Sequence, residues 1–129
     1  MVLVDSSVWV DFFRGRQTPE VETLDELLQE ELVCTCRLIK AEIIPGANTR
    51  KEFDLLKDYF SVLPLLDDPL EFWEQIVDWR FTLKKKGVDG IDIADLMIAV
   101  LAREYECPLL TRDRHFRLMK PVMGLELVS

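Results

Sequence analysis

The stretch VLVDSSVWV (residues 2–10) decides how this chain begins to fold. Its first three apolar residues predict a short buried strand, and Ser6 or Ser7 then predicts the cap of a helix that runs to about Arg14. Asp5 stands between the two elements, where the buried strand ends. A single acid at that place could be no more than a helix cap, so its meaning depends on whether other acids converge there.

Apolar runs and amphipathic segments alternate along the rest of the chain. Further strands are predicted over residues 32–35, 62–66, 108–111 and 125–128, and further helices over residues 18–28, 38–44, 51–60, 70–85 and 93–105. Strands that alternate with helices indicate an α/β fold: a three-layer α/β/α arrangement around a central parallel sheet of about five short strands. Pro64 lies in the third of these strands and suits an edge position.

Composition limits the class of protein. The chain has 129 residues, which suits a single domain over 1–129, and it is 49% hydrophobic. No segment reaches the ~18 uninterrupted apolar residues of a membrane span. An odd number of cysteines (Cys34, Cys36 and Cys107) argues against a disulfide framework and favours reduced thiols in the cytoplasm. With His115 as the one histidine, a zinc site has few candidate ligands.

The net charge of −8 disfavours unaided binding of nucleic acid and is compatible with a divalent cation or a basic partner. Asp5 follows the first strand and Asp113 follows the fourth, so both are expected at the carboxyl edge of the parallel sheet, where ligands bind. Asp92 and Asp95 open the apolar helix 93–105. Asp92 is a good helix cap, whereas Asp95 is expected near the ligand edge because so apolar a helix is central.

Glu42 lies within the apolar segment LIKAEIIPG (residues 38–46). It either faces solvent on an amphipathic helix or faces other acids, since a buried carboxylate is costly without a partner. Carboxylates brought together repel unless a divalent cation lies among them. Mg²⁺ prefers oxygen ligands, and such a site can activate water and stabilise charge on a phosphoryl group. The fitting reaction is hydrolysis of a phosphodiester.

Four stretches together resemble the PIN-domain family and, within it, the VapC-type toxins of toxin–antitoxin pairs. They are VLVDSSVWVDFFRG (2–15), KAEIIPGA (40–47), DIADLMIAVLA (92–102) and PLLTRDRHF (108–116), and the resemblance covers essentially the whole chain. It implies an endoribonuclease that depends on Mg²⁺ or Mn²⁺. The four catalytic acids that it implies are Asp5, Glu42, Asp95 and Asp113.

The resemblance also implies a division of roles. Three of the acids, Asp5, Asp95 and Asp113, would hold the metal, and Glu42 would orient or deprotonate the attacking water or complete a second ion site. Ser7 and Thr111 match positions where the family places a hydroxyl near the acids, and Asp92 is structural or supports the site. Two positions depart from the family: Pro45 follows Glu42 closely, and His115 replaces a common acid. We expect His115 to be an exposed loop residue.

Basic residues near these motifs could hold flanking RNA phosphates: Arg14, Arg112 and Arg114 foremost, with Arg16, Lys84–Lys86 and Arg117. An ordinary solvated surface is the alternative for each. The resemblance implies a VapB-type antitoxin partner and a homodimer. Trp9, Phe12, Phe13, Trp73 and Trp79 could serve as anchors for either interface, although their spacing fits a core as well.

Three other interpretations compete with this one. A receiver domain of two-component signalling has similar length and Mg²⁺-binding acids, but it gives Glu42 and the segment DLMIA (residues 95–99) no role. A phosphatase with Asp5 as nucleophile would need a second acid where Ser7 stands. A PIN fold that serves only as a binding module remains open, and an RNA cleavage assay with and without Mg²⁺ would distinguish it from an enzyme.

Overall fold

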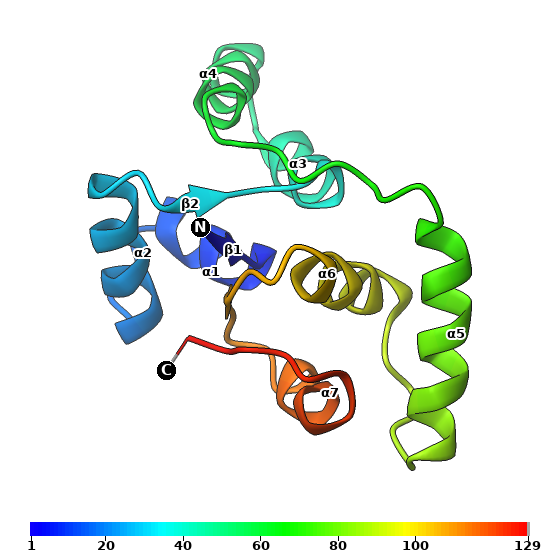
Figure 1. The fold of residues 1–129 in the computed structure, drawn as a ribbon. Coiled ribbons are helices and arrows are strands. Elements are labelled where there is room, and N and C mark those ends of the chain that lie inside the picture. The colour runs from blue at the N-terminus through cyan, green and yellow to red at the C-terminus, as the bar shows by residue number, and fades with distance from the viewer. Residues whose placement is uncertain (129) are drawn as a thin grey trace.

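Three short parallel strands form the centre of the protein. The computed structural model describes residues 1–128. The strands are β1 (Val2–Val4), β2 (Val33–Cys34) and β3 (Leu109–Leu110), in the order β2–β1–β3, and two of them, β1 and β2, are labelled in Figure 1. Every residue of the three strands is buried. Continuous apolar runs of this kind are typical of parallel strands, because helices cover both faces of the sheet.

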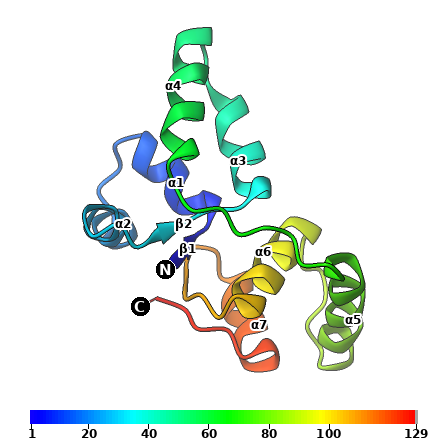
Figure 2. The same ribbon diagram turned by 45° about the horizontal axis from the view of Figure 1, so that its top comes forward.

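Helices flank the sheet on two sides. They are α1 (Ser6–Phe13), α2 (Pro19–Gln29), α3 (Arg37–Ile43), α4 (Arg50–Ser61), α5 (Phe72–Lys85), α6 (Ile93–Glu104) and α7 (His115–Met123), with a 3₁₀ turn, η1 (Ile44–Gly46), after α3. In Figure 2 the helices α1 to α4 lie to one side of the strands and α5 to α7 to the other. The predicted α/β fold with a parallel sheet is confirmed.

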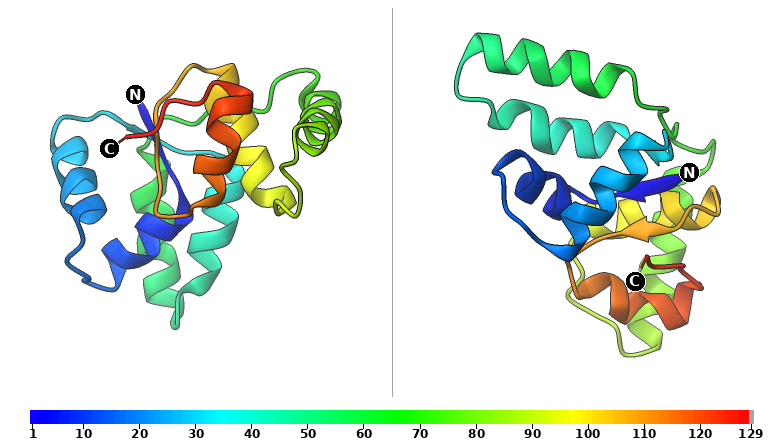
Figure 3. Two further views of the ribbon diagram at one scale, coloured as in Figure 1. Left: turned by 90° about the horizontal axis from the view of Figure 1, so that it is seen from below. Right: turned by 90° about the vertical axis from the view of Figure 1, so that its left-hand side faces the viewer.

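The helix boundaries follow local chemistry. Thr18 caps α2, since its hydroxyl accepts a hydrogen bond from the backbone N–H of Val21 at 3.1 Å, and Pro19 occupies the first helical position. Pro45 and Gly46 end α3 in the 3₁₀ turn, as their sequence predicts. Helix α6 is the most deeply buried of the helices and packs against α5 and α7. Figure 3 shows α5 at the periphery, outside α6.

The predicted number of strands is wrong. Residues 62–66 and 125–128 form only isolated bridges, Thr35 with Leu65 and Leu109 with Leu127. Pro64 accepts a hydrogen bond from the N–H of Thr35 at 2.9 Å but has no N–H to donate, so pairing does not extend. On the other edge, β3 offers only two residues to pair with. The sheet therefore has three strands with a single bridge beyond each edge.

Helix α7 was missing from the sequence prediction. Pro121 lies inside it and disguised its helical character, because proline is unfavourable in a helix interior. The signal that could have revealed it is the spacing of Phe116, Met119 and Met123, which are all buried. Gly124 ends the helix in the left-handed conformation, with φ of 70°.

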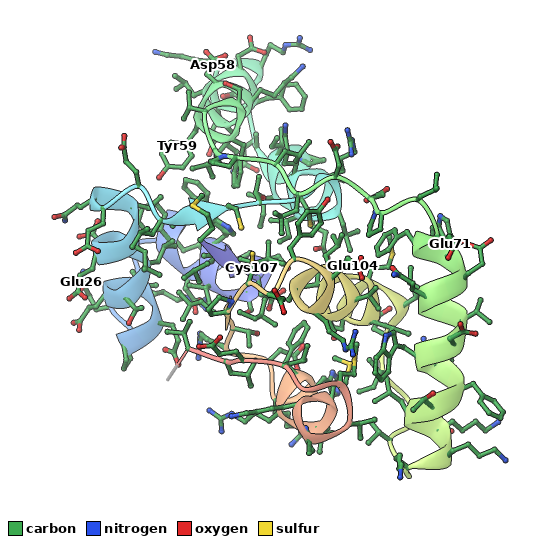
Figure 4. All side chains as sticks on the ribbon, in the orientation of Figure 1. Glu26, Asp58, Tyr59, Glu71, Glu104 and Cys107 are labelled. Carbon is green, nitrogen blue, oxygen red and sulfur yellow. The ribbon has the colours of Figure 1, made fainter. Side chains whose placement is uncertain are left out.

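Two predictions from composition can be checked against the structure. The three cysteines are free thiols, and Cys34 and Cys36 are buried while Cys107, labelled in Figure 4, is half-buried. Within residues 1–128, no helix combines the length and the apolar character that crossing a bilayer requires.

Candidate metal and catalytic site

Asp5 is a buried carboxylate, 3% exposed, immediately after the central strand. It stands at the N-cap position of α1, yet its side chain accepts no capping hydrogen bond from the helix backbone. Its Oδ2 instead accepts hydrogen bonds from the hydroxyls of Ser7 at 2.7 Å and Thr111 at 2.9 Å. The hydroxyls come from two elements, the start of α1 and the loop after β3. The Asp5 carboxylate is thus oriented by these two hydroxyls and does not cap the helix.

The loop between β3 and α7 is tied to the same centre. The backbone N–H of Arg112 donates to Ser7 Oγ at 3.2 Å, and the N–H of Asp113 donates to Thr111 Oγ1 at 3.0 Å. Asp113 itself accepts from the backbone N–H of His115 at 2.9 Å. These bonds fix Asp113 relative to Asp5 although 108 residues separate them in the sequence.

Asp95, Asp113 and His115 form a compact group. Each offers one ligand atom, and these three atoms lie within 4.8 Å of one another. The His115 Nδ1 atom is 3.4 Å from Asp95 Oδ2 and 3.3 Å from Asp113 Oδ1. His115 begins α7 and is half-buried, so the expectation of an exposed loop histidine is wrong. Within residues 1–128, Asp5 lies outside this tightest group.

The electrostatics of this centre show an excess of negative charge. Burial raises the pKa of Asp95 from 3.8 to about 6, and the charges of Asp113 and Asp5 add to the increase, while the contact with His115 opposes it. Asp95 is therefore within the electrostatic influence of both other predicted metal ligands. A cation among these carboxylates would relieve the repulsion that raises the pKa.

Glu42 on α3 approaches the same centre. Burial raises its pKa, and the charges of Asp5 and Asp92 raise it further, while a hydrogen bond from Ser6 lowers it. The residue as a whole is exposed to solvent. Glu42 is thus open to solvent, and the charges of Asp5 and Asp92 nevertheless raise its pKa.

Asp92 is the N-cap of α6, and its Oδ1 lies 3.5 Å from the backbone N of Ala94. This geometry matches the predicted structural role. Asp95 is the third residue of the same helix. Both carboxylates thus belong to the N-terminus of α6.

Asp11 is an acid that the sequence analysis missed. It lies on α1, is 2% exposed, and forms ion pairs with Arg16 at 3.0 Å and with Arg112. The hydrogen bond from Arg112 holds the pKa of Asp11 below its ordinary value. The signal that could have revealed it is the helical spacing that puts Asp11 on the same face as buried Val8.

The predicted RNA contacts separate into two groups. Arg14 and Arg114 are exposed. The guanidinium of Arg112, in contrast, is engaged by Asp11, so the loop after β3 is anchored to α1 by this ion pair. Arg112 therefore holds the loop after β3 in place, and its ion pair with Asp11 makes it less available to RNA phosphates than Arg14 and Arg114.

Asp5 directly follows β1, Asp113 follows β3, and Asp95 and His115 lie beside Asp113. The chain leaves β1 toward helices on one side of the sheet and leaves β3 toward α7 on the other (Figure 2). In this type of sheet, ligands usually bind beyond the carboxyl ends of the strands, at such a switch in direction. The fold and the acidic cluster define a PIN-type α/β domain.

The comparison with family models agrees. The model of the PIN domain matches residues 2–120, so this chain belongs to the PIN-domain family. A receiver domain, the competing class, is therefore wrong.

Similar proteins extend over the full length of the chain. Ribonuclease VapC11 of Mycobacterium tuberculosis is 29% identical over 133 residues, which cover 100% of this chain and 98% of the relative. Among solved structures, VapBC2 from Rickettsia felis, bound to a DNA fragment from its promoter, matches with a TM-score of 0.76 and 20% identity over 99% of this chain and 98% of the other. VapBC-1 from nontypeable Haemophilus influenzae also matches with a TM-score of 0.76 and 20% identity, over 100% of this chain and 98% of the other.

Proposed function

We propose that this protein is a metal-dependent endoribonuclease, the toxin of a VapBC-type toxin–antitoxin pair. The observation that carries the proposal is the convergence of acids from separate elements at the ends of β1 and β3, with Asp5 buried and oriented by two hydroxyls. The full-length similarity to a relative named a ribonuclease supports the same activity.

The donor set fits a hard divalent cation such as Mg²⁺ or Mn²⁺. Asp5, Asp95 and Asp113 would hold the ion, directly or through water, because carboxylate oxygens are the ligands such ions prefer. Burial raises the pKa of Asp95 most, and the charges of Asp113 and Asp5 raise it further, so a cation bound here would be favoured by the nearby negative charge. When bound, the ion would polarise the scissile phosphoryl group and make water more acidic.

The chain's own residues would then divide the remaining work. Ser7 and Thr111 keep the Asp5 carboxylate in one orientation through hydrogen bonds of 2.7 and 2.9 Å. Glu42 accepts a proton at its carboxylate from the attacking water, and its raised pKa makes it a better base near neutral pH than an ordinary glutamate. The water attacks in line, the bond from phosphorus to the 3′ oxygen breaks, and that oxygen takes up a proton from solvent, so the products carry a 3′-hydroxyl and a 5′-phosphate.

RNA must approach an acidic chain, so local basic residues matter. Arg14 and Arg114 are exposed and are our candidates for flanking phosphates, and Lys84–Lys86 at the end of α5 are a further candidate cluster. Exchanging Lys84–Lys86 for glutamate should weaken RNA binding and flatten its dependence on salt. If neither quantity changes, that cluster is only solvated surface.

The proposal includes an antitoxin of the VapB type as partner, a homodimer and a cytoplasmic location. Two solved structures with the same fold are described as VapBC complexes, which supports a protein partner. Phe13 and Trp73 are 40% and 58% exposed and could anchor such an interface, whereas Trp9 is fully buried in the core.

RNA cleavage by purified protein tests the proposal. Cleavage should require added Mg²⁺ or Mn²⁺ and should stop in excess EDTA. Asp5→Asn should abolish it while circular dichroism shows a folded protein. Asp58→Asn, on the outer helix α4 (Figure 4), is the matched control and should retain full activity. Full activity of Asp5→Asn at saturating metal would reject the mechanism, and RNA binding without any cleavage would indicate a binding module instead.

A further inference from the structure

His115 faces the two carboxylates from an element of its own. Its imidazole Nδ1 lies 3.4 Å from Asp95 Oδ2 and 3.3 Å from Asp113 Oδ1, so one nitrogen is nearly equidistant from both acids. Its backbone N–H donates to the same Oδ1 of Asp113 at 2.9 Å, which fixes the start of α7 against that carboxylate. The side chain is 38% exposed, so an ion can reach it from solvent.

Hydrogen bonding explains this position poorly. An N–H···O hydrogen bond is usually about 2.9–3.0 Å long, and both distances exceed that. A ring nitrogen carries at most one hydrogen, so it cannot donate fully to two carboxylates at once. An ion accounts for the arrangement better. Around an octahedral cation with bonds of about 2.1 Å, neighbouring ligand atoms lie about 3 Å apart, close to both N···O separations.

We infer that His115 Nδ1 is a direct ligand of the metal beside Asp95 and Asp113, and that this nitrogen makes the site select first-row transition-metal ions over Mg²⁺. The inference rests on the proposed function for the presence of a metal at the acidic cluster. Imidazole suits transition metals, whereas Mg²⁺ binds oxygen almost exclusively. The consequence is a site of two oxygens and one nitrogen from protein side chains, with Asp5 alongside.

The chain offers an unusually direct test because it contains one histidine. The protein is prepared without a histidine tag and loaded with one equivalent of Mn²⁺ at pH 8. Electron spin-echo envelope modulation should then detect ¹⁴N coupling typical of a bound imidazole. Protein labelled with ¹⁵N only at histidine should lose that ¹⁴N pattern, which assigns the nitrogen to His115 without any mutation.

A competition titration measures the selectivity. Free Mn²⁺ is followed by its electron paramagnetic resonance signal while Mg²⁺ competes for the site. In His115→Asp, which restores an oxygen donor, the preference for Mn²⁺ over Mg²⁺ should fall at least about tenfold. Asp58→Asn is the control and should keep the wild-type preference. If His115→Asp does not fold, the labelling experiment on the wild-type protein still decides the question.

Bound Mn²⁺ without ¹⁴N coupling would overturn the inference, and so would an unchanged preference in folded His115→Asp or a failure of the wild-type protein to bind Mn²⁺. The result is separable from the proposed function because neither measurement involves RNA. Nitrogen coupling in a protein that cleaves no RNA would reject the nuclease and keep the ligand assignment. Cleavage supported by Mg²⁺ with no nitrogen coupling would keep the nuclease and reject the ligand assignment.

Discussion

Replacing Asp95 by asparagine should stabilise the metal-free protein while it destroys the activity. The pKa of Asp95 is raised from 3.8 to about 6, so above pH 6 the folded state bears an ionised carboxylate that the unfolded chain tolerates better. A difference of about two pKa units corresponds to about 3 kcal/mol at pH 7.5. Asparagine has nearly the same shape and carries no charge, so most of this penalty should disappear.

Thermal and urea unfolding in EDTA measure the effect. Asp95→Asn should raise the free energy of unfolding at pH 7.5 by about 2–3 kcal/mol, and Tm by roughly 10 °C. Because the folded pKa exceeds the unfolded one, the wild-type protein loses stability as pH rises between about 4 and 6. The advantage of Asp95→Asn should therefore shrink to about half at pH 5. Asp58→Asn, which changes an exposed acid, should behave like the wild type.

Added Mn²⁺ should reverse the order, because a ligand that binds only the folded state stabilises it, and the uncharged amide oxygen of Asp95→Asn is a weaker donor than a carboxylate. The reasoning would be refuted if Asp95→Asn in EDTA were no more stable than the wild type at pH 7.5, or if its advantage did not depend on pH.

Three further outcomes follow from the geometry. Glu42→Gln should lose most RNA cleavage in a steady-state assay, with little change in unfolding by urea, because its side chain is open to solvent; normal kcat would remove it from the reaction. Asp11→Asn should lower Tm and reduce kcat, because Asp11 anchors Arg112 and the same loop carries Asp113. An unchanged kcat would show that the ion pair between Asp11 and Arg112 contributes only to stability. Burial raises the pKa of Cys34 to about 12. At pH 8, Cys34 should therefore react with a thiol reagent far more slowly than half-buried Cys107. Mass spectrometry of labelled peptides measures both rates, and equal rates would contradict this expectation.

Much of the architecture was predictable because local and global signals agree. The apolar run of β1 and the Thr18-Pro19 start of α2 specify their elements without reference to the rest of the chain. The outer strands were overpredicted for a physical reason. Residues 62–66 are apolar enough for a strand, but Pro64 limits pairing, and the extent of pairing depends on a neighbour that the local sequence does not reveal.

The site was predictable to a lesser degree. Acids at strand ends could be expected at one edge of the sheet, because the ends of parallel strands meet there. The ion pair of Asp11 with Arg112 could not be predicted, because Arg112 lies 101 residues away and such a pairing is set by tertiary packing. His115 is the first residue of α7. Because α7 was not predicted, the contact between His115 and Asp95 could not be predicted either.

The short edges of the sheet, each continued by a single bridge, affect how the protein behaves in concentrated solution. Exposed edge strands recruit strands from other molecules, and long flat edges promote fibrous aggregates. Here each edge is continued by one bridge, and on one side the chain then reaches a proline that has no N–H to offer. Partly opened molecules would find little template for intermolecular β-pairing, so such a chain should stay dispersed under conditions that drive longer-stranded domains into amyloid.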